Sequence, residues 1–451
     1  MLHSVSVDNF RSLERFYLVI NSGLNVLVGP NGSGKTNIIK WLEFLSLLGS
    51  SSLREAIGKI GGANQVFRRN SSGTYSSELN FEFDGATHAT NRFVYNPKEE
   101  DGKILFYLHY KFKGQIAILD NQIFFSRQDI QVWVSDEISR FNSEIRPNIH
   151  IDWAYDVLSD TISPKIEIIK PKNKVIQKNE YARYLFDELS HSKNILSTKF
   201  LTENLLLNSK FYQFDILSYI IKDLQYGRAY NINPGSVRST LDISSPPGVQ
   251  FDGAGVASTL YDLRVSSARQ TGGQYRVRRR SAQEGGPTFQ RIVDYFKLSN
   301  PAISEINVDL DNFRNEFNLN VGFEYDDKKF NVPVSLLSDG TVKWLALVTA
   351  IATDNAAFYV EEPENFLHPR LQENIVSILR SEVTDLKSTR FAIITTHSET
   401  LLNTLRPEEI VLIHMEDGKT VAERIPDPEQ ISRVINDSGF GLGYFYVTGG
   451  F

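Results

Sequence analysis

The chain has 451 residues, of which 41% are hydrophobic and 23% are charged, and it contains no cysteine. This composition is typical of a globular protein with a large core, organised in one to three domains. The lack of cysteine excludes disulfides, thiolate catalysis and Cys-based zinc sites, and it favours a cytoplasmic protein. The net charge of −6 predicts no general attraction to nucleic acid, so any such contact needs a local basic patch.

Two features argue against a membrane protein. The first residues, Met1–Asp8, lack the charged and apolar regions of a signal peptide. The longest apolar stretch, Val342–Val360, is interrupted by Lys343 and Asp354 and is too polar to cross a bilayer. It predicts a buried helix followed by a buried strand, and we expect no membrane partner.

A glycine-rich loop lies between a strand pattern and a helix pattern. Residues 2–7 and 24–28 predict strands, and apolar residues recur at helical spacing over 35–48. The loop Gly29–Thr36 fits the P-loop pattern G-x-x-x-x-G-K-[ST] in the strand–loop–helix context that this motif requires. Backbone N–H groups in such a loop bind phosphate, the lysine reaches the terminal phosphates and the final hydroxyl binds Mg²⁺. The loop therefore predicts an ATP site formed by Asn31, Gly32, Ser33, Gly34, Lys35 and Thr36.

The acidic half of this site comes only near the other end of the chain. Three bulky apolar residues precede Glu361 and Glu362, which indicates a buried strand that delivers two acids to its carboxyl end. We expect Glu361 to hold Mg²⁺ through water and Glu362 to polarise the attacking water. His397 follows a second apolar strand, 391–395, and is predicted to sense the γ-phosphate. Glu362, His397 and Lys35 are the predicted catalytic residues.

A second anion site is predicted at the start of a helix. Ser338 and Asp339 are good N-cap residues, and Gly340 permits close approach of a ligand to the backbone. Because Lys35 already occupies one side of the γ-phosphate, Ser338 and Gly340 are expected to bind a nucleotide held by another protomer. The site would then close only when two copies meet.

The remaining patterns predict an α/β fold with a large insertion. Strands are expected over 79–125, helices over 185–225, and loops around short helices over 226–290. A hairpin turning near 326–327 is predicted within 306–335, followed after the acidic strand by a helix over 368–385, the strand 391–395 and a final hairpin over 410–424. No heptad pattern predicts a long coiled coil. The predicted parts are an N-terminal core, an antiparallel β region, a helical lobe and a C-terminal core, at 1–78, 79–180, 181–305 and 306–451.

These motifs together resemble the ABC-type AAA ATPases of the RecF, SMC and OLD-nuclease group. Within this resemblance, Gly29–Thr36 is the Walker A motif, Leu337–Thr341 the signature motif, Phe358–Glu362 the Walker B motif and Thr395–Ser398 the switch-histidine segment. The run Glu362–Pro369 is similar to the E-P-E-x-x-L-H-P sequence of the OLD-like branch, and the ending Gly439–Gly443 is also similar.

The resemblance implies an ABC-type P-loop ATPase head with an antiparallel β subdomain and a helical lobe. It implies ATP and Mg²⁺ as cofactors, and a homodimer or higher oligomer built from ATP-sandwich dimers. The segment Asn9–Ser12 matches the element that these proteins place beside the nucleotide, which assigns Arg11 to nucleotide binding. Gln65 is the candidate for the Q-loop glutamine.

Two departures from the group narrow the expected role. The missing coiled coil speaks against SMC-like or Rad50-like tethers. An OLD nuclease continues after its switch histidine into a TOPRIM domain, whereas about fifty residues follow His397, fewer than an ordinary domain. The chain thus resembles the ATPase subunits of two-component antiphage systems such as PARIS and Septu, and a separate effector, a nuclease or toxin, is the expected partner.

A basic patch adds two further candidate partners. Seven arginines fall in a glycine-rich region, where they could line a DNA groove, bind an acidic phage protein, bind a partner subunit or form a mobile solvated loop: Arg264, Arg269, Arg276, Arg278, Arg279, Arg280 and Arg291. The leading hypothesis is an ATP-gated sensor or scaffold in phage defence, and the alternative is a RecF-like repair ATPase that binds DNA. A transporter subunit would place its signature nearer the P-loop, and a purely structural ATP-binding protein would not need Glu362 and His397.

Overall fold

The computed structural model describes most of the chain, in twelve stretches. These are residues 1–70, 72–90, 104–135, 146–171, 196, 199–207, 216–225, 227–270, 286–326, 328–354, 357–383 and 391–449. Much of the predicted helical region 185–225 and the arginines at 276–280 lie outside them.

A six-stranded sheet forms the centre of the fold and brings the predicted motifs together. Its strand order is β16-β15-β3-β14-β13-β9, parallel from β15 to β9 and antiparallel between β15 and β16. The bounds, in the same order, are Lys419–Arg424, Ile410–Glu416, Gly23–Val28, Phe391–Thr396, Phe358–Glu361 and Arg228–Tyr230. Strand β14, which ends just before His397, lies between the P-loop strand β3 and the acidic strand β13. Since parallel strands end at the same edge, the P-loop, the acidic pair and His397 share one edge of the sheet.

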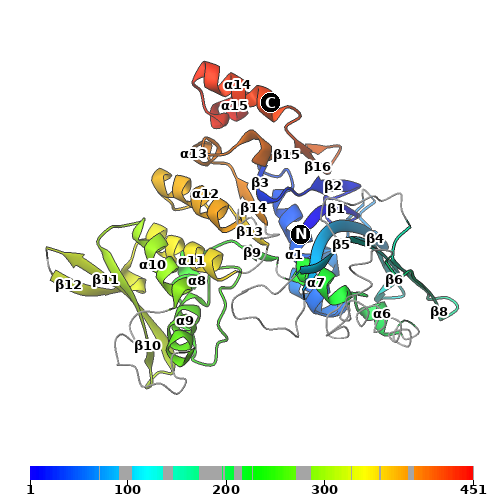
Figure 1. The fold of residues 1–451 in the computed structure, drawn as a ribbon, viewed down its shortest axis with the longest axis horizontal. Coiled ribbons are helices and arrows are strands. Elements are labelled where there is room, and N and C mark those ends of the chain that lie inside the picture. Colours follow the sequence, from blue (N-terminus) through cyan, green and yellow to red (C-terminus); the bar gives the residue numbers. More distant parts are fainter. Residues whose placement is uncertain are drawn as a thin grey trace.

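The two faces of this sheet are buried against different helices (Figure 1). Side chains alternate along each strand: Phe391 and Ile393 of β14 join one core cluster, and Ala392 and Ile394 join the other. The first face is covered by α1 (Lys35–Ser50) and α7 (Leu217–Gln225). The second is covered by helices that include α11 (Asp339–Thr353) and α12 (Pro369–Val383). The expected buried helix and strand within Val342–Val360 are therefore confirmed as α11 and β13.

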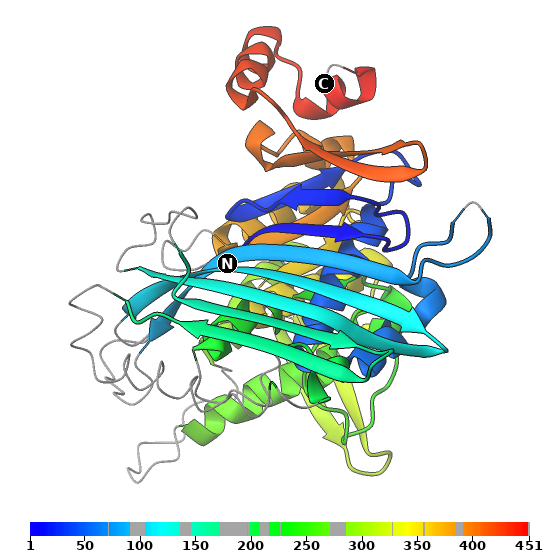
Figure 2. The same cartoon turned by 90° about the vertical axis from the view of Figure 1, so that its right-hand side faces the viewer.

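A seven-stranded antiparallel sheet packs on the outside of α1 and presents its other face to solvent (Figure 2). Its order is β2-β1-β4-β5-β6-β7-β8, with bounds Phe16–Val19, Leu2–Asp8, Glu78–Thr90, Ile104–Leu119, Gln122–Ser135, Ile149–Asp156 and Thr161–Ile168. The predicted antiparallel region is confirmed. The sheet also takes in β1 and β2 from the N-terminal part, so the two parts share one structure.

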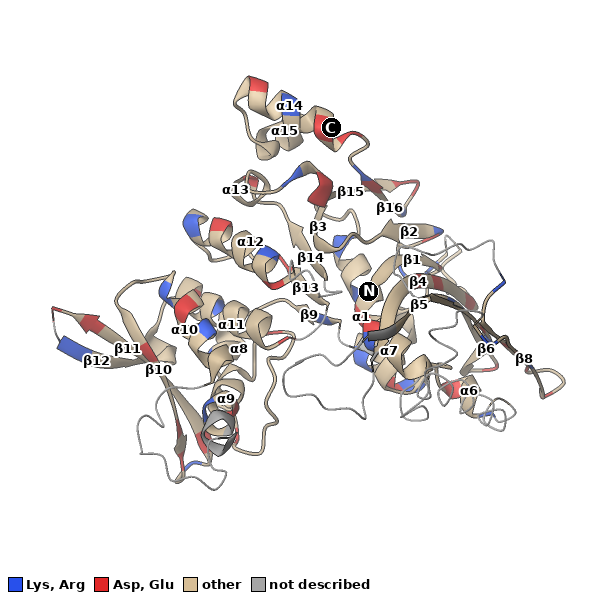
Figure 3. Cartoon of the chain, in the orientation of Figure 1, with Lys and Arg blue, Asp and Glu red and all other residues tan. Residues whose placement is uncertain are grey.

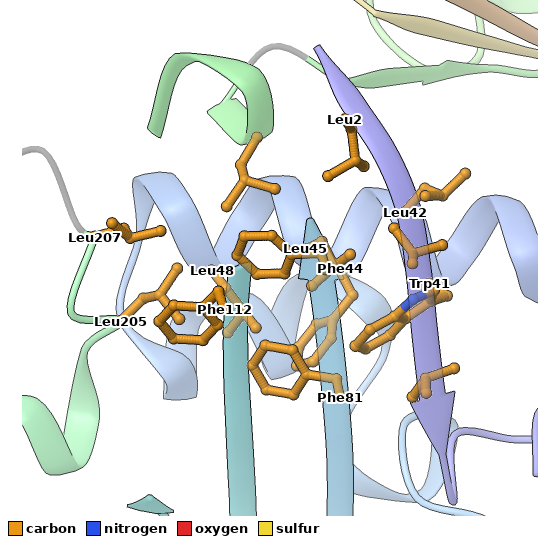
Figure 4. Packing of buried hydrophobic residues seen from close by; sticks show 14 of the residues in the cluster. Leu2, Trp41, Leu42, Phe44, Leu45, Leu48, Phe81, Phe112, Leu205 and Leu207 are labelled. Carbon is orange, nitrogen blue, oxygen red and sulfur yellow. The ribbon is translucent and has the colours of Figure 1, made fainter. Parts of the chain in front are cut away.

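Helix α1 is held between the two sheets by large side chains (Figure 4). The Trp41 and Phe81 rings meet edge to face at 5.6 Å, and Phe81 stacks on Phe112 at 5.9 Å. All three side chains are 3% exposed or less. Truncating one such aromatic to alanine typically costs about 3–5 kcal/mol. The helix that follows the P-loop is therefore anchored in this core from Ile38 to Leu48.

The region before the acidic strand contains short helices and a small sheet. The helices are α8 (Pro234–Arg238), α9 (Val256–Gln270) and α10 (Pro287–Lys297), and the sheet has the order β10-β11-β12. Its strands are Ile303–Asp311, Glu316–Tyr325 and Lys328–Pro333. One hairpin was predicted here, and the structure has two. The missed turn has no glycine: Asp311 accepts hydrogen bonds from the backbone of Phe313 and Arg314, and Asn315 adopts φ 56°.

The remaining elements border the two sheets. Two short helices, α2 (Leu53–Ile60) and α6 (Phe200–Glu203), lie beside the antiparallel sheet. The C-terminal end consists of the helices α13 (Glu399–Leu402), α14 (Pro428–Ser438) and α15 (Leu442–Thr448). Single turns of 3₁₀ helix occur at Ala63–Gln65, Val334–Leu336 and Pro407–Glu409. The glycines of the ending have a packing reason. A Cβ on Gly441 would lie 2.1 Å from Asn403 Oδ1, and the same oxygen accepts a bond from Gly443 N at 2.8 Å.

Candidate functional site

The P-loop connects β3 to α1 and is enclosed by the β15–β16 hairpin. Gly32 and Gly34 adopt φ 81° and 101°, conformations that are unfavourable for side chains with a Cβ. A Cβ on Gly34 would also lie 2.0 Å from the Thr420 hydroxyl, and one on Gly29 would lie 2.0 Å from the Ile413 carbonyl oxygen. The glycines of the motif are therefore required by the fold as well as by the backbone conformation of a phosphate-binding loop.

Lys35 is turned back onto its own loop. The side chain is 7% exposed, and Nζ donates to the carbonyl oxygens of Gly29 at 2.8 Å and Pro30 at 3.0 Å. Burial lowers the pKa of Lys35 from its usual value, while the nearby acids Glu362 and Glu364 act in the opposite direction. The ammonium group is thus poised in the centre of the loop, with acceptors that a phosphate oxygen could replace.

Thr36 and Glu361 meet across the edge of the sheet. The Thr36 hydroxyl donates to Glu361 Oε2 at 3.0 Å, although the two residues come from opposite ends of the chain. Glu361 is 5% exposed, and its other oxygen, Oε1, is buried without a hydrogen-bond partner among the described residues. Burial raises the pKa of Glu361 above its ordinary value, and the Thr36 bond partly offsets this. A buried carboxylate oxygen beside a hydroxyl is a donor set that fits Mg²⁺.

Glu362 begins a tight turn after β13. Its φ is 44°, and its backbone N–H donates to the Thr395 carbonyl at 3.1 Å. Its carboxylate accepts a bond from Asn365 Nδ2 at 2.8 Å, and its carbonyl accepts one from Lys343 Nζ at 2.9 Å. A left-handed conformation is uncommon for a glutamate and is held here by these contacts. The turn places the second acid beyond the end of the sheet.

His397 extends from the end of β14 beside this turn. Its imidazole is exposed, while its backbone N–H donates to Glu364 Oε1 at 2.8 Å. Desolvation, assisted by the Lys35 charge, lowers the pKa of His397 from its usual value, and the acids Glu362 and Glu364 raise it in part. Lys35, Glu362 and His397, predicted to act together, are brought to one edge.

Ser338 begins α11 on the other side of the acidic turn. Its side chain is exposed, and its hydroxyl caps the helix by accepting a bond from Thr341 N at 3.3 Å. A Cβ on Gly340 would lie 2.5 Å from the Phe366 carbonyl oxygen, so the glycine permits contact with the turn that follows β13. Arg238 fixes this end of the helix through Asp339 at 2.6 Å and the Leu337 carbonyl at 2.7 Å.

Comparison with known proteins assigns the family. The model of the family described as "AAA ATPase domain" matches residues 1–242, more than half of the chain. The chain belongs to the AAA ATPase domain family. A second model matches residues 250–403 of this AAA ATPase; its description is an AAA domain, and it names the AbiEii toxin of a type IV toxin–antitoxin system. The two matches contain the P-loop and the acidic strand, respectively.

Curated relatives share short segments with this AAA ATPase. A DNA replication and repair protein RecF of Clostridioides difficile (strain 630) is 44% identical over 45 residues, which are 10% of this chain and 12% of the relative. The RecF of Clavibacter sepedonicus is 36% identical over 70 residues, 15% of this chain and 17% of the relative. The chain thus spans less than a fifth of the length of the relatives that it matches.

Two solved structures have a similar layout over most of this AAA ATPase. One is an SMC head bound to the C-terminal winged-helix domain of ScpA, with a TM-score of 0.48, 11% identity, and coverage of 94% of this chain and 98% of the other. The other is an SMC head from Pyrococcus furiosus with an extended coiled coil, with a TM-score of 0.44, 12% identity, and coverage of 97% and 99%. At these TM-scores the similarity supports no conclusion about activity or partners.

Arg11 and Gln65 of the AAA ATPase lie side by side near the start of α1. The Arg11 guanidinium donates to the backbone carbonyl of Gln65 and, at 3.3 Å, to Asn37 Oδ1. Burial lowers the pKa of Arg11 from its usual value. The Gln65 side chain is exposed. Their proximity to the P-loop helix is compatible with the predicted nucleotide contacts, which stay predictions.

The structure describes only part of the predicted arginine patch. Arg276, Arg278, Arg279 and Arg280 lie outside the described residues, as does the side chain of Arg269. Arg291 is engaged within the chain, since it donates to the Ala352 carbonyl at 2.8 Å and pairs with Glu382 at 3.5 Å. Arg264 also contacts the Val308 carbonyl. Elsewhere on the ribbon, basic and acidic residues are interspersed (Figure 3).

The sequence motifs do not identify the roles of two further residues at the site. Lys343 is buried within α11 and reaches the Glu362 carbonyl, and Glu364 joins the acidic turn to β14. Both contacts depend on tertiary structure, although Glu364 does fall within the E-P-E sequence. Within the described part of the chain, the helices are all too short or too polar to cross a membrane.

Proposed function

We propose that this AAA ATPase binds Mg²⁺–ATP in the Thr36–Glu361 site and hydrolyses it when two copies meet. The observation that carries the proposal is the 3.0 Å bond between Thr36 and Glu361, whose other carboxylate oxygen is buried and has no hydrogen-bond partner in the described part of the chain. It joins the P-loop to the acidic strand in the way that a P-loop metal site requires. Glu362 and His397 follow at the same edge, so the groups for binding and hydrolysis converge.

Each residue of the site would have a distinct role in ATP binding or hydrolysis. Lys35 exchanges its bonds to the Gly29 and Pro30 carbonyls for phosphate oxygens, and the loop N–H groups orient the phosphates. Thr36 and Glu361 would hold Mg²⁺, which neutralises developing charge on the phosphates when bound. Glu362 orients the attacking water and accepts its proton, while His397 contacts the γ-phosphate.

A composite site explains the placement of Ser338. Helix N-termini attract anions, and Ser338 at the N-terminus of α11 is exposed, which supports an anion site there. Gly340 of α11 approaches Phe366 in the turn after β13, while Glu361 at the end of β13 contacts Thr36 of the P-loop. A second copy related by two-fold symmetry would bring its own Ser338 and Gly340 to the γ-phosphate. ATP would then be bound by both copies and would stabilise the dimer.

The direct test is hydrolysis as a function of protein concentration. A composite site predicts that the specific activity rises with concentration and that ATP with Mg²⁺ increases the molecular mass in light scattering. Full specific activity of an isolated monomer, independent of concentration, would refute the composite site. Loss of hydrolysis on chelation of Mg²⁺, restored by its addition, tests the metal requirement.

The biological output proposed for this switch is control of a separate effector, a nuclease or toxin, in antiphage defence. Support comes from the OLD-like run Glu362–Pro369 and from the matching family whose description names a toxin–antitoxin system. Such an ATPase would act as a sensor and scaffold whose ATP state controls the effector. Purification from the native host followed by mass spectrometry tests this, with an effector chain as the expected partner.

The alternative function is DNA repair with direct DNA binding. The specific observation in its favour is the identity to RecF proteins over 45 to 70 residues. Hydrolysis stimulated by DNA would favour repair, and its absence would favour defence. Charge reversal at Arg278, Arg279 and Arg280 tests whether the arginine patch contributes to DNA binding. If it does, the affinity for DNA should fall with the positive charge removed, because arginines bind the DNA phosphates.

A further inference from the structure

Glu364 connects the acidic turn to β14 through one carboxylate oxygen. Its Oε1 accepts two bonds, from the Thr396 hydroxyl at 2.7 Å and from the His397 backbone N–H at 2.8 Å. Hydrogen bonds to a charged acceptor are about twice as strong as neutral ones. The first donor belongs to the last residue of β14, and the second belongs to His397, the residue that follows the strand. One side chain therefore fixes the point from which the histidine projects.

Two further hydrogen bonds hold the turn that contains Glu364. Glu362 N donates to the Thr395 carbonyl at 3.1 Å, and Lys343 Nζ donates to the Glu362 carbonyl at 2.9 Å. Beyond the strand, the Thr396 hydroxyl accepts a bond from Ser398 N at 3.0 Å. The contacts form a continuous path from the signature helix through the acidic turn to β14.

The position of the Glu364 carboxylate is energetically unfavourable. Its second oxygen, Oε2, is buried and has no hydrogen-bond partner among the described residues. Leaving a buried acceptor unsatisfied typically costs about 1–3 kcal/mol, and more for a charged group. An unfavourable environment of this kind is expected where a side chain serves the site.

We infer that Glu364 is a positioning residue that locks the end of β14 to the turn after β13, so that His397 and Glu362 keep a fixed spacing. The inference rests on the proposed ATPase function and adds a residue to it. Glu364 acts through its partners: the P-loop binds the nucleotide, while Glu364 keeps the two groups that act on the γ-phosphate in register. Its loss should therefore affect turnover much more than ATP binding.

The test compares Glu364→Ala with Glu364→Gln. Alanine removes the acceptor, whereas glutamine retains a carbonyl oxygen that can accept both bonds. Because small misplacements of reacting groups can cost about 100-fold, we expect kcat to fall about 10- to 100-fold in Glu364→Ala, with KM for ATP changed less than about 3-fold. The kcat of Glu364→Gln should lie within about 5-fold of the wild-type kcat. Glu373→Ala, on the exposed face of α12, is the matched control and should behave as wild type.

A second readout is independent of ATP turnover. Amide hydrogen exchange of the His397 N–H, followed without nucleotide, should accelerate at least about 10-fold in Glu364→Ala and stay near wild type in Glu364→Gln. If Glu364→Ala fails to fold, Thr396→Val removes one of the two donors and should lower kcat about 3- to 10-fold.

The outcomes separate this inference from the function on which it rests. A wild-type chain without ATPase activity refutes the proposed function, and the exchange measurement still tests the lock. Wild-type kcat and exchange in Glu364→Ala would overturn the lock, as would a Glu364→Gln variant as impaired as Glu364→Ala. An equal loss in ATP affinity and kcat would assign Glu364 to binding and also overturn it.

Discussion

The Thr36 hydroxyl donates a hydrogen bond of 3.0 Å to Glu361 Oε2, which joins the first helix of the chain to a strand near its other end. The contact is made because β14 inserts between β3 and β13 and aligns the ends of the three strands: Thr396 pairs with Val28, and Glu361 pairs with Thr395. The long separation in sequence is thus bridged in one sheet. The intervening chain supplies strands β4 to β8 of the antiparallel sheet, and it also supplies α11.

Lys35→Ala should abolish ATP binding. The change removes the charge that meets the phosphates, and charge-assisted bonds to a phosphate contribute enough for a loss of affinity of at least about 100-fold. Titration with a fluorescent ATP analogue measures this. Lys59→Ala, on the exposed face of α2, is the control and should bind like wild type. Equal affinity of wild type and Lys35→Ala would remove Lys35 from the site.

Glu362→Gln should trap ATP in a closed dimer. The amide keeps the size of the side chain but cannot accept a proton from water, so hydrolysis should fall about 100- to 10,000-fold while binding persists. Light scattering after gel filtration with Mg²⁺–ATP should show a stable dimer for this variant. Glu429→Gln on α14 is a surface control. A variant that remains monomeric with ATP bound would contradict the sandwich arrangement.

The local motifs were predictable from the sequence because their signals are local. A strand, a glycine loop and an amphipathic helix follow one another around Lys35, and the apolar residues before Glu361 require a buried strand. The structure confirms these elements and their convergence. The elements that were missed depend on distant partners: β9 has only three residues and is a strand because it pairs with β13. Similarly, β2 exists through its pairing with β1.

The site contacts that were missed have the same cause. Nothing in the spacing of Lys343 and Glu362 indicates that a lysine inside an apolar helix donates to a carbonyl in the next element. The contact requires the helix to pack against the acidic turn, which Gly340 permits by its approach to Phe366. The role of Ser338 differs, since its predicted ligand belongs to a second copy, and it therefore stays a prediction.

Lys343 should make stability depend on pH in a defined window. The side chain is 1% exposed, and burial lowers its pKa from 10.5 to about 8. Between these two values the unfolded chain binds more protons than the folded chain, so the free energy of unfolding rises with pH. Wild type should gain about 2 kcal/mol relative to Lys343→Met between pH 8 and pH 10. Urea unfolding of both proteins at these pH values measures the difference; parallel pH profiles would show that Lys343 titrates normally.

Mixing two inactive variants should restore hydrolysis if the site is composite. Lys35→Ala lacks a P-loop lysine, and Ser338→Arg places a bulky cation where the partner's phosphate would bind. Each homodimer then contains two defective sites. In a mixed dimer, one site combines the intact P-loop of the Ser338→Arg chain with the intact Ser338 of the Lys35→Ala chain.

Equal amounts of the two variants should therefore restore hydrolysis, to about a quarter of the wild-type activity where pairing is random, because half of the dimers are then mixed and each has one intact site. The control is a mixture of Lys35→Ala with Glu362→Gln. Both of these changes lie on the P-loop side of the site, so each site of a mixed dimer has one defect and activity should stay low. Recovery in the control, or none in the first mixture, would mean that Ser338 does not act across the dimer.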